Sequence, residues 1–157
     1  RRHNTAVLIS PKGELIGKYR KHELGHELVR NSPGRDMPVF DTPFGRVGLM
    51  ICADRRNADL VGQLKANGAE LLICPSGGMF GPKTNDPILQ ARSKETGLPI
   101  VFVHPAEFLV TGPSGDIERR ELLGDKLEVA PADVGSALDS SDVYFFDVEP
   151  VRSNDGE

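Results

Sequence analysis

The sequence contains only two cysteines, no long apolar run and no cluster of basic residues. Two cysteines cannot supply the dense pattern of a disulfide-stabilised secreted scaffold, so we expect Cys52 and Cys74 to be reduced thiols of a cytoplasmic protein. No secretory signal peptide is recognised. No apolar run approaches the ~20 residues that span a bilayer, so membrane insertion is not expected.

The charge pattern argues against a nucleic-acid partner. The formal net charge is -4 at pH 7, and lysine and arginine are scattered apart from short pairs such as Arg55-Arg56. A basic stripe, which nucleic-acid binding requires, is missing, and we expect a small-molecule partner instead. A length of 157 residues suits one domain. The sequence begins with Arg1 and an apolar strand follows at once, which predicts a start inside a domain.

Hydrophobic periodicity and turn residues predict two hairpins followed by alternating strands and helices. The hairpins cover 5–10 with 14–20 and 39–42 with 46–52, and a long polar loop at 21–37 separates them. Asp54 is predicted to cap a helix at 55–67 that Gly68 ends, and Asp86-Pro87 to begin a helix that ends at Gly97. Further strands are predicted at 71–74, 99–104, 108–111, after the turn 112–115, and at 143–148. This order indicates an α/β fold.

Cys52 has the position of a nucleophile. It closes an apolar strand and precedes a predicted helix, where backbone N–H groups and the helix dipole stabilise a thiolate. The alternative for a cysteine taken alone is a small buried hydrophobic residue. Cys74 lies in the middle of an apolar strand, and we expect it in the core.

The residues around Cys52 resemble a known family motif. The segment Gly48-Leu49-Met50-Ile51-Cys52-Ala53-Asp54-Arg55-Arg56 is similar to the nucleophile motif of the nitrilase superfamily of carbon-nitrogen hydrolases, Gly-x-x-Ile-Cys-x-Asp-x-Arg. Upstream, Gly17-Lys18-Tyr19-Arg20-Lys21 resembles the segment of that family that carries the catalytic lysine. The stretches 4–13 and 68–76 resemble the strands that flank these motifs. The resemblance is clear from about residue 4 to 104 and looser to about 150.

The resemblance implies a fold and a set of catalytic roles. The fold is an α-β-β-α sandwich with paired sheets inside and helices outside, present here as its C-terminal part, and it usually assembles into homo-oligomers. Cys52 attacks the carbonyl or nitrile carbon and forms a thioester, while the Lys21 ammonium and the Ala53 N–H hold the developing negative charge. Glu27 supports the lysine and the substrate. No cofactor or metal is implied.

Further features of the motif bear on the substrate. Asp54, Arg55 and Arg56 either pair with one another and lock the loop after the nucleophile, or Arg56 binds a substrate carboxylate, as an arginine here does in carbamoylase-like members. For Asp54 we favour the structural role. The sequence departs from the family at Glu23-Leu24 and Ala58-Asp59, where His-Leu and Pro-Glu are usual. The family's general-base glutamate belongs to a segment upstream of Arg1.

A second motif competes with this interpretation. His22-Glu23-Leu24-Gly25-His26 matches the His-Glu-x-x-His signature, in which two imidazoles on one helix face bind Zn²⁺ and the glutamate activates water. The motif needs a helix, whereas a predicted β-strand runs into it and Gly25 interrupts it.

Three functions therefore remain. The first is thiol-dependent hydrolysis of a non-peptide carbon-nitrogen bond, amide or N-carbamoyl, since Cys52 is followed by Ala-Asp-Arg and not by the Glu-Asn that is typical of nitrile hydrolysers. The alternatives are a zinc metallopeptidase and a non-catalytic scaffold that keeps the fold.

Overall fold

The computed structural model describes residues 2–78, 80–105 and 107–122, with the short strands at 128–129 and 144–145. Within these residues no helix is both long and apolar enough to cross a membrane. The elements are, in chain order, β1 (Thr5–Ile9), β2 (Leu15–Arg20), η1 (Gly25–Val29), β3 (Val39–Thr42), β4 (Gly45–Leu49), η2 (Cys52–Arg56), α1 (Ala58–Ala66), β5 (Leu71–Pro75), α2 (Pro82–Thr96), β6 (Ile100–His104), β7 (Glu107–Thr111), β8 (Ile117–Leu122), β9 (Glu128–Val129) and β10 (Tyr144–Phe145).

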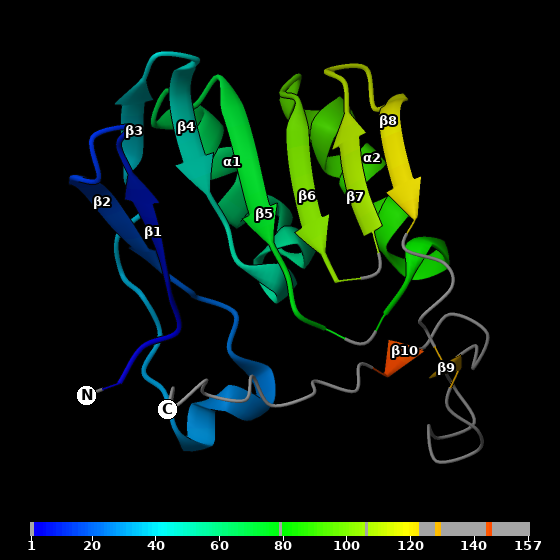
Figure 1. Ribbon diagram of the computed structural model, residues 1–157, viewed down its shortest axis with the longest axis horizontal. Coiled ribbons are helices and arrows are strands. Elements are labelled where there is room, and N and C mark those ends of the chain that lie inside the picture. Colours follow the sequence, from blue (N-terminus) through cyan, green and yellow to red (C-terminus); the bar gives the residue numbers. More distant parts are fainter. Residues whose placement is uncertain (1, 79, 106, 123–127, 130–143, 146–157) are drawn as a thin grey trace, which may run out of the picture.

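Six strands form one mixed sheet in the order β3-β4-β5-β6-β7-β8. β4, β5 and β6 run parallel, because a helix connects each to the next, whereas β3, β7 and β8 pair antiparallel. α1 and α2 both lie behind the sheet in Figure 1, and the β1-β2 hairpin lies beside its β3-β4 end. The strand and helix order confirms the predicted α/β class.

The core divides into two clusters on opposite faces of the sheet. Between the sheet and the helices lie Leu64 of α1, Leu72 of β5 and Phe102 of β6, all fully buried. On the other face, Tyr19 of β2 packs with Val47 and its neighbours in β4, so the hairpin covers this end of the sheet.

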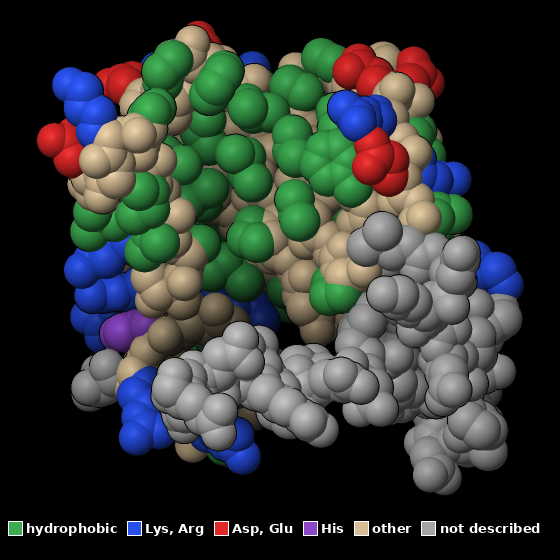
Figure 2. Space-filling model, viewed as in Figure 1, with side chains coloured by type: hydrophobic (Ala, Val, Ile, Leu, Met, Phe, Trp, Pro, Cys, Tyr) green, Lys and Arg blue, Asp and Glu red, His purple; other side chains and the backbone are tan. Residues whose placement is uncertain are grey.

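The remainder of the sheet face opposite the helices is apolar and exposed to solvent. Burial alternates along β6, where Phe102 is fully buried and Val103 is 46% exposed. Figure 2 shows hydrophobic side chains across the middle of the sheet on this face. In the predicted sandwich a second sheet packs here, and the described residues supply one helix layer and one sheet layer.

The predicted start of the first helix was wrong. α1 begins at Ala58 and not at residue 55, and its cap is Asn57, whose Oδ1 accepts a hydrogen bond of 3.0 Å from the Leu60 N–H. Asp54 is therefore not the cap, because its carboxylate is occupied by other donors. The predicted strand at 46–52 also ends early, at Leu49, and residues 52–56 form the 3-10 turn η2.

The second helix begins four residues before the predicted start. α2 runs from Pro82, because proline in the first turn of a helix needs no hydrogen-bond partner for its nitrogen, and Pro87 lies inside the helix. The predicted stop is confirmed, since Gly97 caps the helix with a left-handed φ of 66°. Of the strand predicted at 143–148, only Tyr144–Phe145 lies among the described residues, as β10.

Candidate active site

Cys52 lies beyond the carboxyl ends of the three parallel strands. β4 ends at Leu49, β5 at Pro75 and β6 at His104, and the parallel pairing brings these ends to one edge of the sheet (Figure 1). Crevices outside such edges are the usual ligand sites of open α/β sheets. Cys52 also has a φ of 48°, and no other non-glycine residue of the described chain has a positive φ. Strain of this kind is concentrated at functional sites.

The pKa values of the two cysteines shift in opposite directions. Burial acts to raise the pKa of the partly exposed Cys52 thiol, but the neighbouring Ser76 hydroxyl, the contact with Arg55 and the charges of Arg55 and Lys21 outweigh it, so the pKa is lowered. The buried Ser76 hydroxyl has no hydrogen-bond partner among the described residues. Cys74 is fully buried, which raises its pKa to about 12 and confirms it as a core residue.

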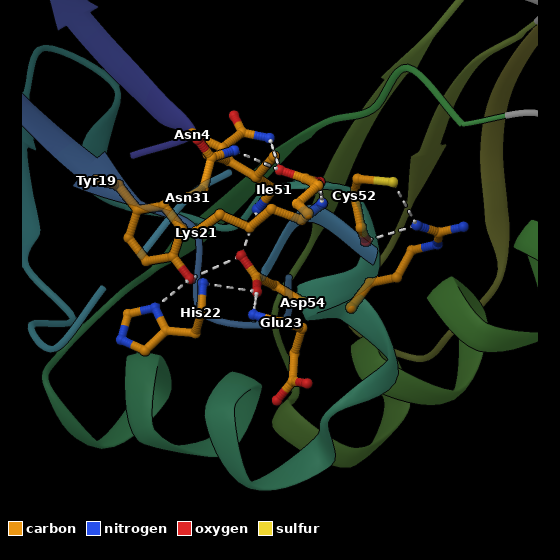
Figure 3. A network of polar contacts seen from close by, with 11 residues as sticks. Asn4, Tyr19, Lys21, His22, Glu23, Asn31, Ile51, Cys52 and Asp54 are labelled. Carbon is orange, nitrogen blue, oxygen red and sulfur yellow. Dashed lines mark hydrogen bonds and ion pairs between the residues drawn. The ribbon is translucent and has the colours of Figure 1, made fainter. Parts of the chain in front are cut away.

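Lys21 is a buried cation paired with Glu27. Only 4% of Lys21 is exposed, and its Nζ donates to Oε1 of Glu27. The side-chain amides of Asn4 and Asn31 donate to Oε2 of Glu27 at 2.9 and 3.3 Å (Figure 3). Burial opposes ionisation of Glu27, but these donors lower its pKa. Lys21 is thus not the solvated lysine that would be expected without the motif, because a lysine is rarely buried unless paired.

Asp54 joins the lysine segment to the nucleophile turn. It is fully buried, and its two oxygens accept from the Tyr19 hydroxyl and from the N–H groups of Ile51, His22 and Glu23. The backbone segment that follows Lys21 is thereby fixed against the turn that carries Cys52, as Figure 3 shows. The structural role predicted for Asp54 is present, but its partners are backbone groups and a phenol and not the two arginines.

The two arginines after Asp54 lie in different environments. Arg55 is 2% exposed, and its Nη1 lies 2.5 Å from the Cys52 carbonyl oxygen and 3.7 Å from Sγ. Arg56 is exposed, with its guanidinium 5.4 Å from the centre of the Phe80 ring. Sequence reasoning missed the contact of Arg55 with Cys52. A 3-10 turn brings residues i and i+3 onto the same side. The three-residue spacing of Cys52 and Arg55 therefore predicts their contact only once the turn type is known.

The loop after β5 lies against the nucleophile. A Cβ added to Gly78 would meet Cys52 Sγ at 3.5 Å, which is ordinary contact distance. The loop is held from both sides, because His104 at the end of β6 bonds to the Gly78 carbonyl and Asn85 of α2 donates to the Phe80 carbonyl at 2.6 Å. The carboxyl ends of β4, β5 and β6 therefore all contribute to the surroundings of the sulfur.

The zinc motif does not assemble. Residues 25–29 form a 3-10 turn and not an α-helix, so His22 and His26 do not share a helix face. His22 Nδ1 contacts the Tyr19 hydroxyl at 3.0 Å, and Glu23 accepts from Asn57. In the described part of the chain, no three His, Cys, Asp or Glu side chains are grouped so that they could hold a metal ion. The metallopeptidase alternative is not supported.

Comparison with known proteins finds relatives of this chain in one family. The profile of the family described as carbon-nitrogen hydrolase matches residues 1–152. A probable nitrilase of Schizosaccharomyces pombe is 29% identical over 97% of this chain and 57% of its own length. Human omega-amidase NIT2 is 33% identical over 66% of this chain and 42% of its own. The chain thus spans about half the length of these relatives.

Solved structures show the same fold. Nit3 of Saccharomyces cerevisiae, a member of branch 10 of the nitrilase superfamily, superposes with a TM-score of 0.68 at 28% identity, over 76% of this chain and 49% of that one. An amidase from Nesterenkonia superposes with a TM-score of 0.69 at 26% identity, over 75% and 50%. The nitrilase-type fold predicted from the motifs is confirmed over this part of the chain.

Proposed function

This chain belongs to the carbon-nitrogen hydrolase family, and we propose that it carries the nucleophile of an enzyme that hydrolyses a non-peptide carbon-nitrogen bond, in an amide or an N-carbamoyl group. The reaction runs through a thioester on Cys52. Relatives with the names omega-amidase and deaminated glutathione amidase support an amide over a nitrile.

The bond changes follow from the residues at the site. Cys52 Sγ attacks the carbonyl carbon, and the oxyanion that forms is held by the Lys21 ammonium and the Ala53 N–H. Collapse of this intermediate breaks the C–N bond, and the nitrogen leaves with the proton that the general base has taken from Cys52. Water then gives a proton to the same base and attacks the thioester, which releases the acid and returns Cys52 to its resting state. The resemblance assigns the role of general base to a glutamate on an earlier segment of the family's fold.

The observation that carries the proposal is the buried Lys21–Glu27 ion pair. Asp54 accepts hydrogen bonds from the backbone just after Lys21 and so holds this pair beside the turn that carries Cys52. A lysine that is 4% exposed has lost most of its hydration, and its charge then acts strongly on an oxyanion in the same dry site. Glu27 keeps that charge in place. This pairing is the role that the resemblance gives to Glu27.

Arg56 is proposed to bind a carboxylate of the substrate. Its guanidinium is exposed and stacked on Phe80, in the loop that also contacts Cys52, so it is available to an anionic group at the mouth of the site. Planar guanidinium groups bind carboxylates through two parallel hydrogen bonds. The substrate class is therefore a small amide or N-carbamoyl compound that carries a free carboxylate.

The test uses the full-length protein with a panel of ω-amides of dicarboxylic acids and N-carbamoyl amino acids. We expect hydrolysis that Cys52→Ala abolishes and that EDTA leaves unchanged, with an acyl adduct on the Cys52 peptide by mass spectrometry. Arg56→Met is expected to raise KM about tenfold or more for the acidic amides but not for propionamide. Turnover that survives Cys52→Ala, or no adduct with any substrate, contradicts the proposal. Assembly into homo-oligomers and a cytoplasmic location stay predictions from the sequence.

A further inference from the structure

Arg55 is an unusual buried charge. Its guanidinium lies over the Phe102 ring at 5.6 Å, its Nη2 donates to Oδ1 of Asn85, and its Nη1 faces Cys52. With 2% of the residue exposed, water contributes little to the stability of the charge. No carboxylate is among its contacts in the described part of the chain.

A buried charge requires a counter-charge or a complete set of hydrogen bonds. Asn85 and the Cys52 carbonyl are neutral acceptors, and a phenyl ring offers only a partial negative charge. Among the described groups that contact the Arg55 guanidinium, the Cys52 sulfur alone can become an anion. A thiolate at this position would therefore complete the electrostatic environment of the guanidinium.

The same side chain acts on the backbone of the nucleophile. Cys52 has a left-handed φ of 48°, a conformation that is unfavourable for a residue with a Cβ. Arg55 Nη1 bonds to the carbonyl oxygen of that same residue, and Asn85 anchors the other end of the guanidinium to α2. Arg55 thus connects the backbone of Cys52 to α2 and restrains the turn.

We propose that Arg55 is a positioning residue, which fixes the left-handed backbone of Cys52 and holds its sulfur as a thiolate, and that it does not bind substrate. The proposal goes beyond the proposed function, in which Lys21 is the electrostatic partner of the sulfur during hydrolysis. It concerns the resting state of the thiol, so it can be tested whether or not a substrate is known.

Other polar and titratable groups near the Cys52 sulfur also influence its pKa. Lys21 lies on the loop after β2, Ser76 on the loop after β5, Cys74 in β5, and Asp54 on the same turn as Arg55. Lys21 already has a carboxylate partner in Glu27, and Asp54 accepts four hydrogen bonds. Removal of Arg55 therefore leaves the sulfur with Ser76 and with the Lys21 charge, which Glu27 partly offsets.

The experiment measures the rate at which iodoacetamide alkylates Cys52 in the full-length protein between pH 5 and 10, with the modified peptide identified by mass spectrometry. In Arg55→Met, which retains packing on Phe102, we expect the midpoint of the profile to rise by about one pH unit. The rate at pH 7 falls only about threefold to tenfold, since a more basic thiolate is also more nucleophilic. Arg55→Lys, which keeps the charge, should recover part of the shift.

Arg46→Met is the matched control. Arg46 also donates to a main-chain carbonyl, that of Asn67, but it is exposed and lies at the opposite end of β4. The pH profile of Cys52 alkylation in Arg46→Met should match that of the wild type. If circular dichroism shows that Arg55→Met does not fold, Asn85→Ala, which releases one end of the guanidinium, should move the midpoint in the same direction by less. An unchanged midpoint in the folded variants overturns the proposal, as does a folded Arg55→Met in which only KM for acidic substrates rises.

Discussion

The Tyr19 hydroxyl donates a hydrogen bond of 2.8 Å to Oδ2 of Asp54 and so ties β2 to the turn that carries Cys52. Burial and the neighbouring carboxylate raise the pKa of the phenol, which keeps it protonated as a donor. The same carboxylate accepts from the backbone just after Lys21. One buried aspartate therefore connects the two segments whose motifs suggested the family.

Asp54→Asn is expected to destabilise the fold by about 2–4 kcal/mol. An amide has one acceptor oxygen, so its NH₂ group would face either the N–H groups of His22 and Glu23 or the Ile51 N–H and the Tyr19 hydroxyl. Urea denaturation followed by circular dichroism measures the loss. Asp59→Asn, an exposed position on α1, is the control and should stay within about 0.5 kcal/mol. Equal effects of the two changes would contradict the role of Asp54.

The Lys21–Glu27 pair is expected to give stability that depends on pH. The pKa of Glu27 is lower in the folded chain than its ordinary value of about 4.3. Its contribution is therefore complete above pH 4.3 and is lost as the pH falls through the folded pKa. The difference in unfolding free energy between the wild type and Glu27→Gln should be large at pH 6 and shrink below pH 4.

The control for this prediction is Glu95→Gln. Glu95 pairs with Arg92 at 2.8 Å, but it is half exposed, so water screens the pair. Its replacement should change the unfolding free energy little at either pH. A difference for Glu27→Gln that is the same at pH 3 and pH 6 would show that the carboxylate charge is not what stabilises the pair.

The two cysteines are expected to react at very different rates. Limiting iodoacetamide at pH 7 should label Cys52, whose pKa is lowered, and leave Cys74, which is fully buried with a pKa of about 12. In 8 M urea both should react at similar rates. Peptide mapping measures the two adducts, and native labelling of Cys74 at a rate comparable to that of Cys52 would contradict the assignment.

Gly34→Ala is expected to disturb the lysine segment. An added Cβ would lie 2.2 Å from the Arg20 carbonyl oxygen, and Gly34 N–H donates to the Lys21 carbonyl at 2.8 Å. Since the clash is with backbone, the strand end that positions Lys21 must move. We expect a loss of about 2 kcal/mol in stability and a lower kcat in the hydrolysis assay.

Gly62→Ala, in contrast to Gly34→Ala, is expected to stabilise the fold. This glycine lies within α1, and an added Cβ meets nothing within 4 Å. Alanine should therefore stabilise the helix by about 0.5–1 kcal/mol and leave turnover unchanged. Thermal denaturation compares the two variants, and a destabilised Gly62→Ala would show that the space above α1 is not open.

Much of the fold was predictable because it depends on local patterns. The two hairpins, the strand at 71–74 and the stop at Gly97 follow from alternation, apolar runs and turn residues, and the structure confirms them. The helix starts were wrong, because Asp54 and Asp86 both look like caps in sequence. Asp54 instead accepts hydrogen bonds from residues about thirty positions away, and no local rule anticipates such partners.

The sequence by itself determined the family, the α/β order and the identity of Cys52, Lys21 and Glu27 as the residues to examine, since these depend on residue types at fixed spacing. Only the tertiary structure decided how Arg55 and Arg56 differ. They are adjacent in sequence, yet the 3-10 turn buries one guanidinium against the sulfur and leaves the other exposed on Phe80. Burial and long-range hydrogen bonds arise from the packing of distant segments, and they set the charge and acidity of the site.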